Sequence, residues 1–168
     1  MDHALEGDPE IPGGWFLRGR ANAAAGNHLH AAEDFGRSVV AEPGSAEAWM
    51  QKGLSEETLD RHREAAESFA RAAELAPGRA EAWYRLGLAR QAIKDHEGAV
   101  EALDRAVEID PDQADAWYRK GVSEATLERY ADEAVSFDRS VEKEPANGEA
   151  WYRLGLARQA IDDHEGAV

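Results

Sequence analysis

The stretch AEAWYRLGLARQAIKDHEGAVEALDRAVEIDPDQ, residues 80–113, contains two segments in which apolar residues recur every three or four positions. That spacing places the apolar residues on one face of an α-helix, so amphipathic helices are predicted near 80–93 and 97–109. The two apolar faces comprise Trp83, Leu86, Gly87, Ala89 and Ile93, and then Ala99, Leu103, Ala106 and Val107. The stretch therefore predicts one pair of amphipathic helices.

A short polar connection, Lys94-Asp95-His96, separates the two predicted helices. Asp95 is a typical N-cap, because its carboxylate can accept a hydrogen bond from a free backbone N–H in the first turn. Pro111 ends the second helix, since proline has no backbone N–H and its ring clashes with the preceding turn. The unit is therefore a helix–turn–helix that closes near Pro111.

The same pattern recurs along the chain with a period of 34 residues, because 49 − 15 = 34 for the first two tryptophans and the interval then repeats. The five tryptophans are Trp15, Trp49, Trp83, Trp117 and Trp151. A fixed period of this length is typical of helical repeat arrays. The predicted organisation is the end of a preceding repeat at 1–11, repeats at 12–45, 46–79, 80–113 and 114–147, and a truncated repeat at 148–168.

These residues resemble the tetratricopeptide repeat family, whose unit carries a Trp, a Leu-Gly pair, an Ala, a Phe and a Pro. The matching residues in the third unit are Trp83, Leu86, Gly87, Ala99, Leu103, Ala106 and Pro111. The resemblance covers essentially the entire chain. It implies an all-α fold, a right-handed superhelical solenoid of stacked antiparallel helix pairs.

Three kinds of position depart from the family pattern. The residue seven after each Trp is polar where an aromatic is expected, and the residue three after it is Arg18, Lys52 or Lys120 in alternate units, for which looser packing is expected. In the fourth unit, Glu133 replaces the small residue at which the two helices cross. Because a buried carboxylate would be costly there, we expect a slightly rotated second helix and a solvated Glu133.

The sequence also repeats with a longer period of 68 residues, which is twice the length of one repeat. Residues 82–100 and 150–168 differ only at Lys94 and Asp162, so the third and fifth units offer the same surface. By the 34-residue register the chain is expected to begin inside a second helix and to end shortly after another has started. The apolar side of the first helix in the fifth unit, with Trp151, Leu154 and Ala157, would then be uncovered, which predicts weak head-to-tail self-association.

Composition and motifs argue against several classes of function. The 168 residues carry 34 Asp and Glu against 19 Lys and Arg, a formal net charge of −15 that disfavours nucleic acid and anionic membranes as partners. No phosphate-binding loop, nucleophile elbow or zinc-protease motif is present, there is no Cys, and no apolar run could span a membrane. We expect a non-enzymatic, cytoplasmic protein with no cofactor.

The histidines and tryptophans have structural interpretations. His28, His62, His96 and His164 lie thirteen after their Trp, where the fourth unit has Tyr130, so a half-buried ring opening each second helix is favoured over a metal site. Equivalent residues of stacked helices lie roughly 8–10 Å apart, whereas zinc ligands lie about 2 Å from the metal. Each Trp is expected to fill the space between the helices of its unit, so that Trp83→Ala would cost about 3–5 kcal/mol.

The family resemblance implies a concave groove, lined by the first helices, in which peptides bind. The lining residues that it implies here are Glu81, Tyr84, Arg85, Leu88, Asp115, Tyr118, Arg119, Val122, Glu149, Tyr152, Arg153 and Leu156. The Lys and Asn set with which some members clamp acidic chaperone tails is missing. An alternative is that the three tyrosines only pack between neighbouring first helices.

The leading interpretation is a protein–protein interaction scaffold that binds a peptide or helix of a partner. Two alternatives remain open: a regulatory or substrate-recruiting repeat arm of a larger enzyme, and a self-assembling head-to-tail structural array.

Overall fold

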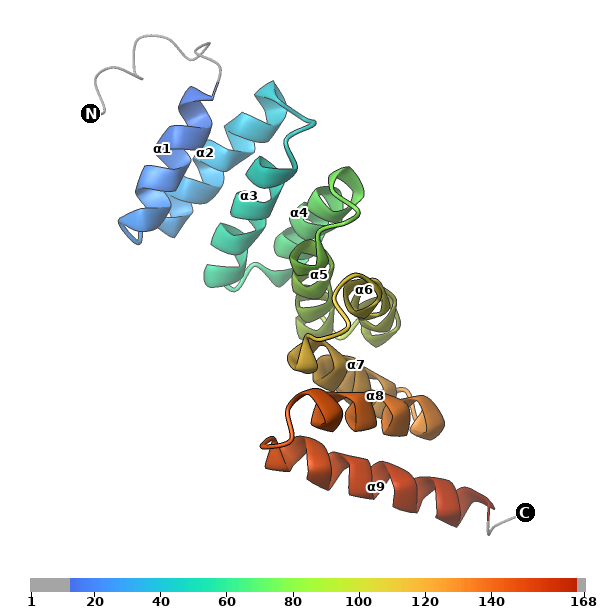
Figure 1. The fold of residues 1–168 in the computed structure, drawn as a ribbon. Coiled ribbons are helices and arrows are strands. Elements are labelled where there is room, and N and C mark those ends of the chain that lie inside the picture. Colours follow the sequence, from blue (N-terminus) through green and yellow to red (C-terminus); the bar gives the residue numbers. More distant parts are fainter. Residues whose placement is uncertain (1–12, 166–168) are drawn as a thin grey trace. The chain divides into compact units, whose positions relative to one another are not determined.

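The computed structural model describes residues 13–165, and side chains for residues 13–162. These residues form nine α-helices and no strand, which confirms the all-α prediction (Figure 1). The helices are α1 (Gly14–Ala24), α2 (His28–Ala41), α3 (Ala46–Thr58), α4 (His62–Leu75), α5 (Ala80–Ala92), α6 (His96–Ile109), α7 (Ala114–Thr126), α8 (Tyr130–Lys143) and α9 (Gly148–Glu165).

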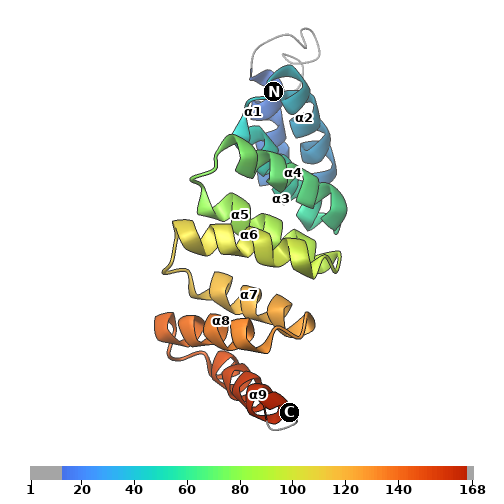
Figure 2. The same cartoon turned by 90° about the vertical axis from the view of Figure 1, so that its right-hand side faces the viewer.

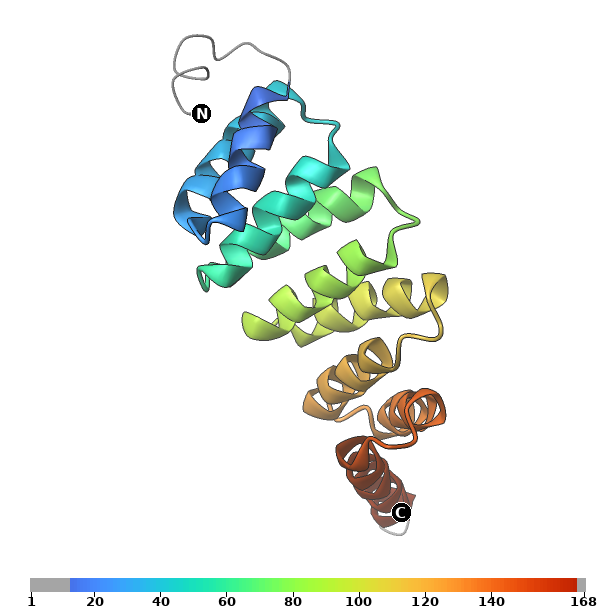
Figure 3. The ribbon, with the colours of Figure 1, turned by 60° about the vertical axis from the view of Figure 1, so that its left-hand side comes forward.

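The helices pack in chain order within two compact units. In the first unit, up to Pro77, α1 packs on α2, α2 on α3 and α3 on α4 (Figure 3). In the second unit, from Gly78, each of the helices α5 to α9 packs on the next (Figure 2). Stacked helix pairs of this kind, each in contact mainly with its neighbours, are the architecture expected of a helical repeat array.

The turn inside each pair has the same geometry in four repeats. The residue eleven after the Trp adopts a left-handed conformation, with φ of 77° at Gly26, 57° at Asp60, 64° at Lys94 and 57° at Glu128. Asp95 then caps α6 as predicted, because its carboxylate accepts a hydrogen bond of 3.0 Å from the Gly98 N–H. These turns bring the second helix back along the first.

The fifth repeat departs from this geometry. Asp162 matches Lys94, yet α9 continues through it to Glu165 without a turn. The prediction that a second helix starts shortly before the end of the chain is therefore wrong for the residues up to Glu165. The local sequences are almost identical, so the turn at Lys94 depends on the packing of α6 against α5 and not on local sequence alone.

A large apolar side chain from the second helix fills the centre of each helix pair. Phe35, Phe69, Leu103 and Phe137 are completely buried. Each lies against a glycine of the first helix, where a Cβ would come within 2.6–2.9 Å of the side chain. The glycine four residues after each Trp therefore sets how closely the two helices approach.

The tryptophans do not have the central position predicted for them. Trp117 is only half-buried and packs on the cluster of Leu103, Val107 and Ala116, two of which belong to the preceding repeat. Its indole Nε1 donates a hydrogen bond of 3.0 Å to the Pro111 carbonyl, an arrangement repeated at Trp49 and Trp151. Because the indole N–H takes its acceptor from the preceding loop, the ring stays at the edge of the pair.

Glu133 also differs from the prediction. Its exposed fraction is 7%, so the residue is buried and not solvated, at the crossing position where Ala31, Ala65 and Ala99 are completely buried. Burial raises the pKa of the Glu133 carboxyl above its ordinary value, and the charge of Arg153 opposes that shift. The second helix is therefore not rotated to expose Glu133, and α8 keeps the same orientation as the other second helices although this buries a carboxyl group.

Candidate binding surface on the first helices

The residues implied for the groove lie on α5, α7 and α9, all in the second unit. We call the twelve residues from Glu81 to Leu156 given above the first-helix face. The acidic residue that starts each set, Glu81, Asp115 or Glu149, is exposed. The three tyrosines that lie three residues further on, Tyr84, Tyr118 and Tyr152, differ in their contacts and exposure.

Tyr84 connects two neighbouring first helices. Its hydroxyl donates a hydrogen bond to the Asp115 carboxylate of α7, and its ring packs on the cluster of Leu103, Val107 and Ala116. Burial, together with the bond to Asp115, raises the pKa of Tyr84 to about 12. Most of what Tyr84 could offer a ligand is therefore used inside the protein.

Tyr118 has a similar internal role one repeat later. Its ring lies 5.7 Å from that of Phe137, and it packs on the cluster of Phe137, Val141, Ala150 and Leu154. Burial lowers the pKa of the Arg153 guanidinium, but interactions with Tyr118 and Glu149 more than offset this and leave the pKa raised. Tyr118 thus connects α7 to α9.

Tyr152 is different, because 63% of its surface is exposed. Leu156, one helical turn further along α9, is 46% exposed. The two lie on one side of the helix, since residues four apart are neighbours on a helix surface. An accessible apolar contact area on the first-helix face is therefore found on α9.

The polar groups around this area are paired with one another. Arg119 lies 3.4 Å from the Asp115 carboxylate, and the Arg153 guanidinium donates a hydrogen bond of 2.9 Å to Glu149. The Gln91 amide donates to the Arg119 carbonyl and to the Ser123 hydroxyl, at 2.7 Å each. The face therefore presents alternating, mutually neutralised charge.

Sequence reasoning missed a buried polar network inside the second repeat. The Lys52 ammonium lies 2.7 Å from Glu56 and donates a hydrogen bond of 2.9 Å to the Ser68 hydroxyl, which in turn donates one of 2.6 Å to Glu56. Glu56 is 5% exposed and Ser68 is completely buried. Residues three, seven and nineteen after the Trp thus form one hydrogen-bonded group.

The network recurs in the fourth repeat and, with other residues, in the first. Ser136 donates a hydrogen bond of 2.6 Å to Glu124, and the Lys120 ammonium lies 3.4 Å from the same carboxylate. In the first repeat, Arg18 and Asn22 both donate to Asp34, at 2.9 Å. In the third repeat the equivalent positions hold Leu86, Arg90 and Ala102. The signal in the sequence is that the residues three, seven and nineteen after the Trp change together between repeats. It is visible only when these three positions are compared as a set.

The second helices begin as the histidine register predicted. His28, His62, His96 and Tyr130 are the first residues of α2, α4, α6 and α8, and each is half-buried. His164 lies outside the residues whose side chains are described. No group of three metal-ligating side chains occurs among the described side chains. That the chain holds no stoichiometric metal stays a prediction, which elemental analysis of the purified protein can check.

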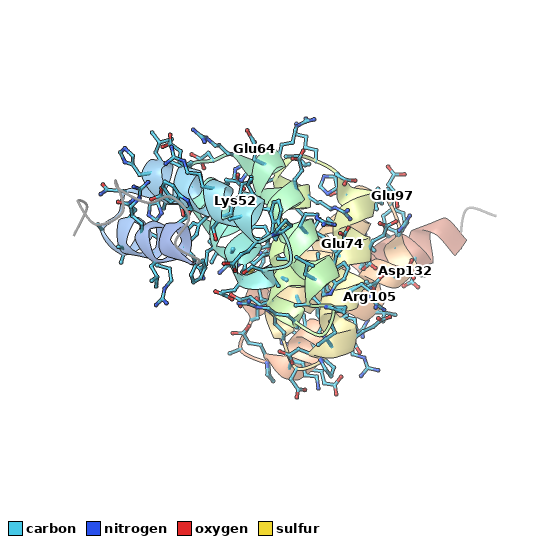
Figure 4. The ribbon with its side chains drawn as sticks, turned by 90° about the horizontal axis from the view of Figure 1, so that it is seen from above. Lys52, Glu64, Glu74, Glu97, Arg105 and Asp132 are labelled. Atoms are coloured by element: carbon cyan, nitrogen blue, oxygen red, sulfur yellow. The ribbon has the colours of Figure 1, made fainter. Side chains whose placement is uncertain are left out.

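No described helix is long and apolar enough to cross a membrane. Many side chains on the outer surfaces of the second helices are charged, and Figure 4 labels Glu64, Glu74, Glu97, Arg105 and Asp132 among them. Several form ion pairs within one helix, such as Arg105 with Glu108 at 2.7 Å. Such exposed pairs contribute little to stability.

The stacked helix pairs and the glycine-centred packing define a helical repeat protein. The family model described as tetratricopeptide repeat matches residues 16–80, 50–114 and 95–143, so the chain belongs to the tetratricopeptide repeat family. No curated protein sequence matches the chain.

Solved structures show the same fold at low sequence identity. The crystal structure of MamA has a TM-score of 0.80 at 24% identity, over 86% of this chain and 84% of that chain. YrrB, described as a TPR protein with an unusual peptide-binding site, has a TM-score of 0.84 at 18% identity, over 99% of this chain and 86% of that chain. The TPR domain of Arabidopsis OM64 has a TM-score of 0.63 at 22% identity, over 68% of this chain and 94% of that chain. At these identities the likeness shows the fold alone.

Proposed function

We propose that the chain is a non-enzymatic scaffold that binds a peptide or helix of a partner protein on the first-helix face of its second unit. The observation that carries the proposal is the exposure of Tyr152 and Leu156, at 63% and 46%, on a helix whose neighbours use the equivalent tyrosines for internal packing. Membership of a family that mediates protein–protein interaction supports it, as does the peptide-binding site named for YrrB.

The expected ligand carries apolar side chains and little net charge. Tyr152 and Leu156 offer an apolar contact, and aromatic anchors of this kind contribute strongly to affinity at protein interfaces. The neighbouring charges are already paired, as Arg153 is with Glu149 at 2.9 Å. A highly charged peptide would have to break such pairs, whereas an extended or helical apolar segment would not.

Selection of peptides from a random displayed library against the purified chain tests the proposal. Peptides that bind are then measured against the variant Tyr152→Ala/Leu156→Ala, which removes two exposed side chains and leaves the packing of Tyr118 intact. We expect affinity to fall by about tenfold or more, which corresponds to about 1.4 kcal/mol.

The matched control is Val40→Ala, which shortens an 80% exposed apolar side chain on α2 of the first unit. It should leave peptide affinity unchanged. Selected peptides that bind the double variant as tightly as the parent chain would place the binding site elsewhere.

A further inference from the structure

Glu133 of α8 is a buried carboxyl group without a partner among the described residues. It is 7% exposed, and it forms no hydrogen bond or ion pair with any of them. Its oxygens are not among the fully enclosed polar atoms of the described chain that lack a hydrogen bond, so they keep some contact with solvent. Buried polar groups are normally hydrogen-bonded, so this carboxyl group needs an explanation.

The charges that act on Glu133 come from the two first helices beside it. Burial raises the pKa of the Glu133 carboxyl, Arg153 of α9 opposes that shift, and Glu124 of α7 adds to it. The Arg153 guanidinium is already bonded to Glu149 at 2.9 Å and also interacts with Tyr118. Glu133 therefore lies where α7, α8 and α9 meet, near a cation whose hydrogen bonds go to other residues.

Comparison with the third repeat shows what Glu133 lacks. In the third repeat the residues eight and sixteen after the Trp are Gln91 and Ala99, whereas in the fourth repeat they are Ala125 and Glu133. The Gln91 amide connects α5 to α7 through two hydrogen bonds of 2.7 Å. The fourth repeat places its polar group on the second helix instead, and the described residues give that group no such bonds.

Packing does not require a carboxyl group at this position. Ala31, Ala65 and Ala99 occupy it in the first three repeats and are completely buried. Burying a carboxyl group without a hydrogen bond costs stability, so Glu133 is a residue that the fold alone would not favour. Residues that break a packing rule in this way are typical of functional sites.

Charge complementarity specifies the missing partner. Two carboxylates on the adjoining first helices already have cations, Glu124 with Lys120 at 3.4 Å and Glu149 with Arg153 at 2.9 Å. Glu133 has none among the described residues. One additional positive charge would complete the pairing, and a hydrogen bond between a cation and a carboxylate is roughly twice as strong as one between neutral groups.

We propose that Glu133 binds one cationic side chain, a lysine or an arginine, of the peptide that lies on the first-helix face. The apolar stem of such a side chain can lie between the first helices while its charged end reaches a recessed carboxylate. A peptide with one such residue still carries little net charge. This inference rests on the proposed peptide-binding function and adds to it a preference for one cation in the ligand.

The test selects peptides from a random displayed library on the full chain and, in parallel, on the variant Glu133→Ala. The peptides selected on the parent chain should share a Lys or Arg at one aligned position. Those selected on Glu133→Ala should show no such preference. The variant has the residue of the other three complete repeats at this position, so it should fold normally.

Binding measurements then give the size of the effect. One peptide selected on the parent chain is synthesised with its cationic residue and with norleucine, which keeps an apolar stem without the charge. Norleucine should weaken binding to the parent chain by about tenfold and should have little effect on binding to Glu133→Ala. Glu133→Gln, which keeps the size of the side chain without its charge, should behave like Glu133→Ala.

Two controls separate this contact from other effects. Glu142→Gln removes one negative charge at a 53% exposed position of the same helix, and it should keep the preference for the cationic peptide. Tyr152→Ala/Leu156→Ala should weaken the cationic and the norleucine peptides by the same factor, because it removes apolar contacts alone.

Equal binding of the two peptides to the parent chain would overturn this inference and leave the proposed function in place. An undiminished effect of norleucine on Glu133→Ala would overturn it as well, since the cation would then bind elsewhere. Failure of the proposed function appears differently, as tight binding of both peptides to Tyr152→Ala/Leu156→Ala. A library that yields no binder on the parent chain overturns both.

Discussion

Gly87 of α5 lies so close to Leu103 of α6 that a Cβ on residue 87 would stand 2.6 Å from the leucine Cγ. Leu103 is completely buried, so it could make room for a Cβ only by displacing the side chains packed around it. The absence of one carbon atom therefore sets the distance between the two helices. The same relation joins a glycine to a phenylalanine in the first, second and fourth repeats.

Gly87→Ala should destabilise the chain by about 1–3 kcal/mol, the usual cost of overpacking a filled core. Gly155→Ala is the matched control, because it makes the same change at the same repeat position where no atom lies within 4 Å. It should be neutral or stabilise α9 by about 0.5–1 kcal/mol, the helix preference of Ala over Gly. Urea unfolding followed by circular dichroism measures both, and equal effects would contradict this role for the glycine.

The loss of stability on replacing an aromatic residue by Ala should depend on how deeply that residue is buried. Phe137 is completely buried, so Phe137→Ala should cost about 3–5 kcal/mol. Trp117 is half-buried at the edge of its pair, so Trp117→Ala should cost only about 1–2 kcal/mol despite removing a larger ring. Comparison of the two midpoints in urea checks the order, and a larger loss for Trp117→Ala would restore the central role first expected of the tryptophans.

The repeat period was sufficient to predict the helices and their pairing. Trp83 and Gly87 recur in every repeat, and the position of Leu103 holds a large apolar residue in each of the first four, because each repeat packs its two helices in the same way. A periodic sequence pattern indicates that packing directly. The first residues of the second helices, from His28 to Tyr130, follow from the same register.

Other features depend on contacts that no local pattern contains. The turn at Lys94 and the unbroken helix at Asp162 have nearly the same sequence, and of these two repeats only that of Lys94 has, among the described residues, a second helix packed on its first helix. The cost of burying a carboxylate predicts a solvent-exposed Glu133. In the structure Phe137 is completely buried, and Glu133, one helical turn before it on the same side of α8, is buried with it. The twelve residues of the first-helix face could be placed on the right helices, but whether each faces a neighbour or solvent depended on three-dimensional packing.

The polar network of the fourth repeat should behave as a unit. Glu124 is 2% exposed and accepts a hydrogen bond of 2.6 Å from Ser136, while the Lys120 ammonium lies 3.4 Å away. Lys120→Leu alone leaves this carboxylate without its cation, and should cost about 3–5 kcal/mol. Lys120→Leu combined with Glu124→Ala removes both charges and should cost less than Lys120→Leu alone.

A double-mutant cycle of Lys120→Leu and Glu124→Ala, measured by thermal and urea unfolding, gives the coupling free energy. Additive losses would show that the two charges are independent and that water screens Glu124. The third repeat, with Leu86, Arg90 and Ala102 at these positions, shows that the fold does not require the network.

Glu133 should make the chain less stable as the pH rises. Burial raises the pKa of this carboxyl above its ordinary value of 4.5, the nearby charge of Glu124 acts in the same direction, and Arg153 opposes both. Between 4.5 and the raised value, the folded state binds more protons than the unfolded state. The Glu133 contribution to the free energy of unfolding therefore falls as the pH rises through that window, and it is most favourable at lower pH.

Glu133→Ala restores the residue found at the equivalent buried positions Ala31, Ala65 and Ala99. It should stabilise the chain at pH 7 by about 1 kcal/mol, because the cost of burying the carboxylate disappears. Glu133→Gln is the control that keeps size and polarity but cannot titrate. The measurement is urea unfolding from pH 4 to 8, in which the stability gained by each variant over the parent chain should shrink as the pH falls. Other carboxyl groups, Glu124 included, titrate in both proteins and cancel to first order in that difference. A difference independent of pH would show that Glu133 titrates normally in the folded protein and that its burial carries no electrostatic cost.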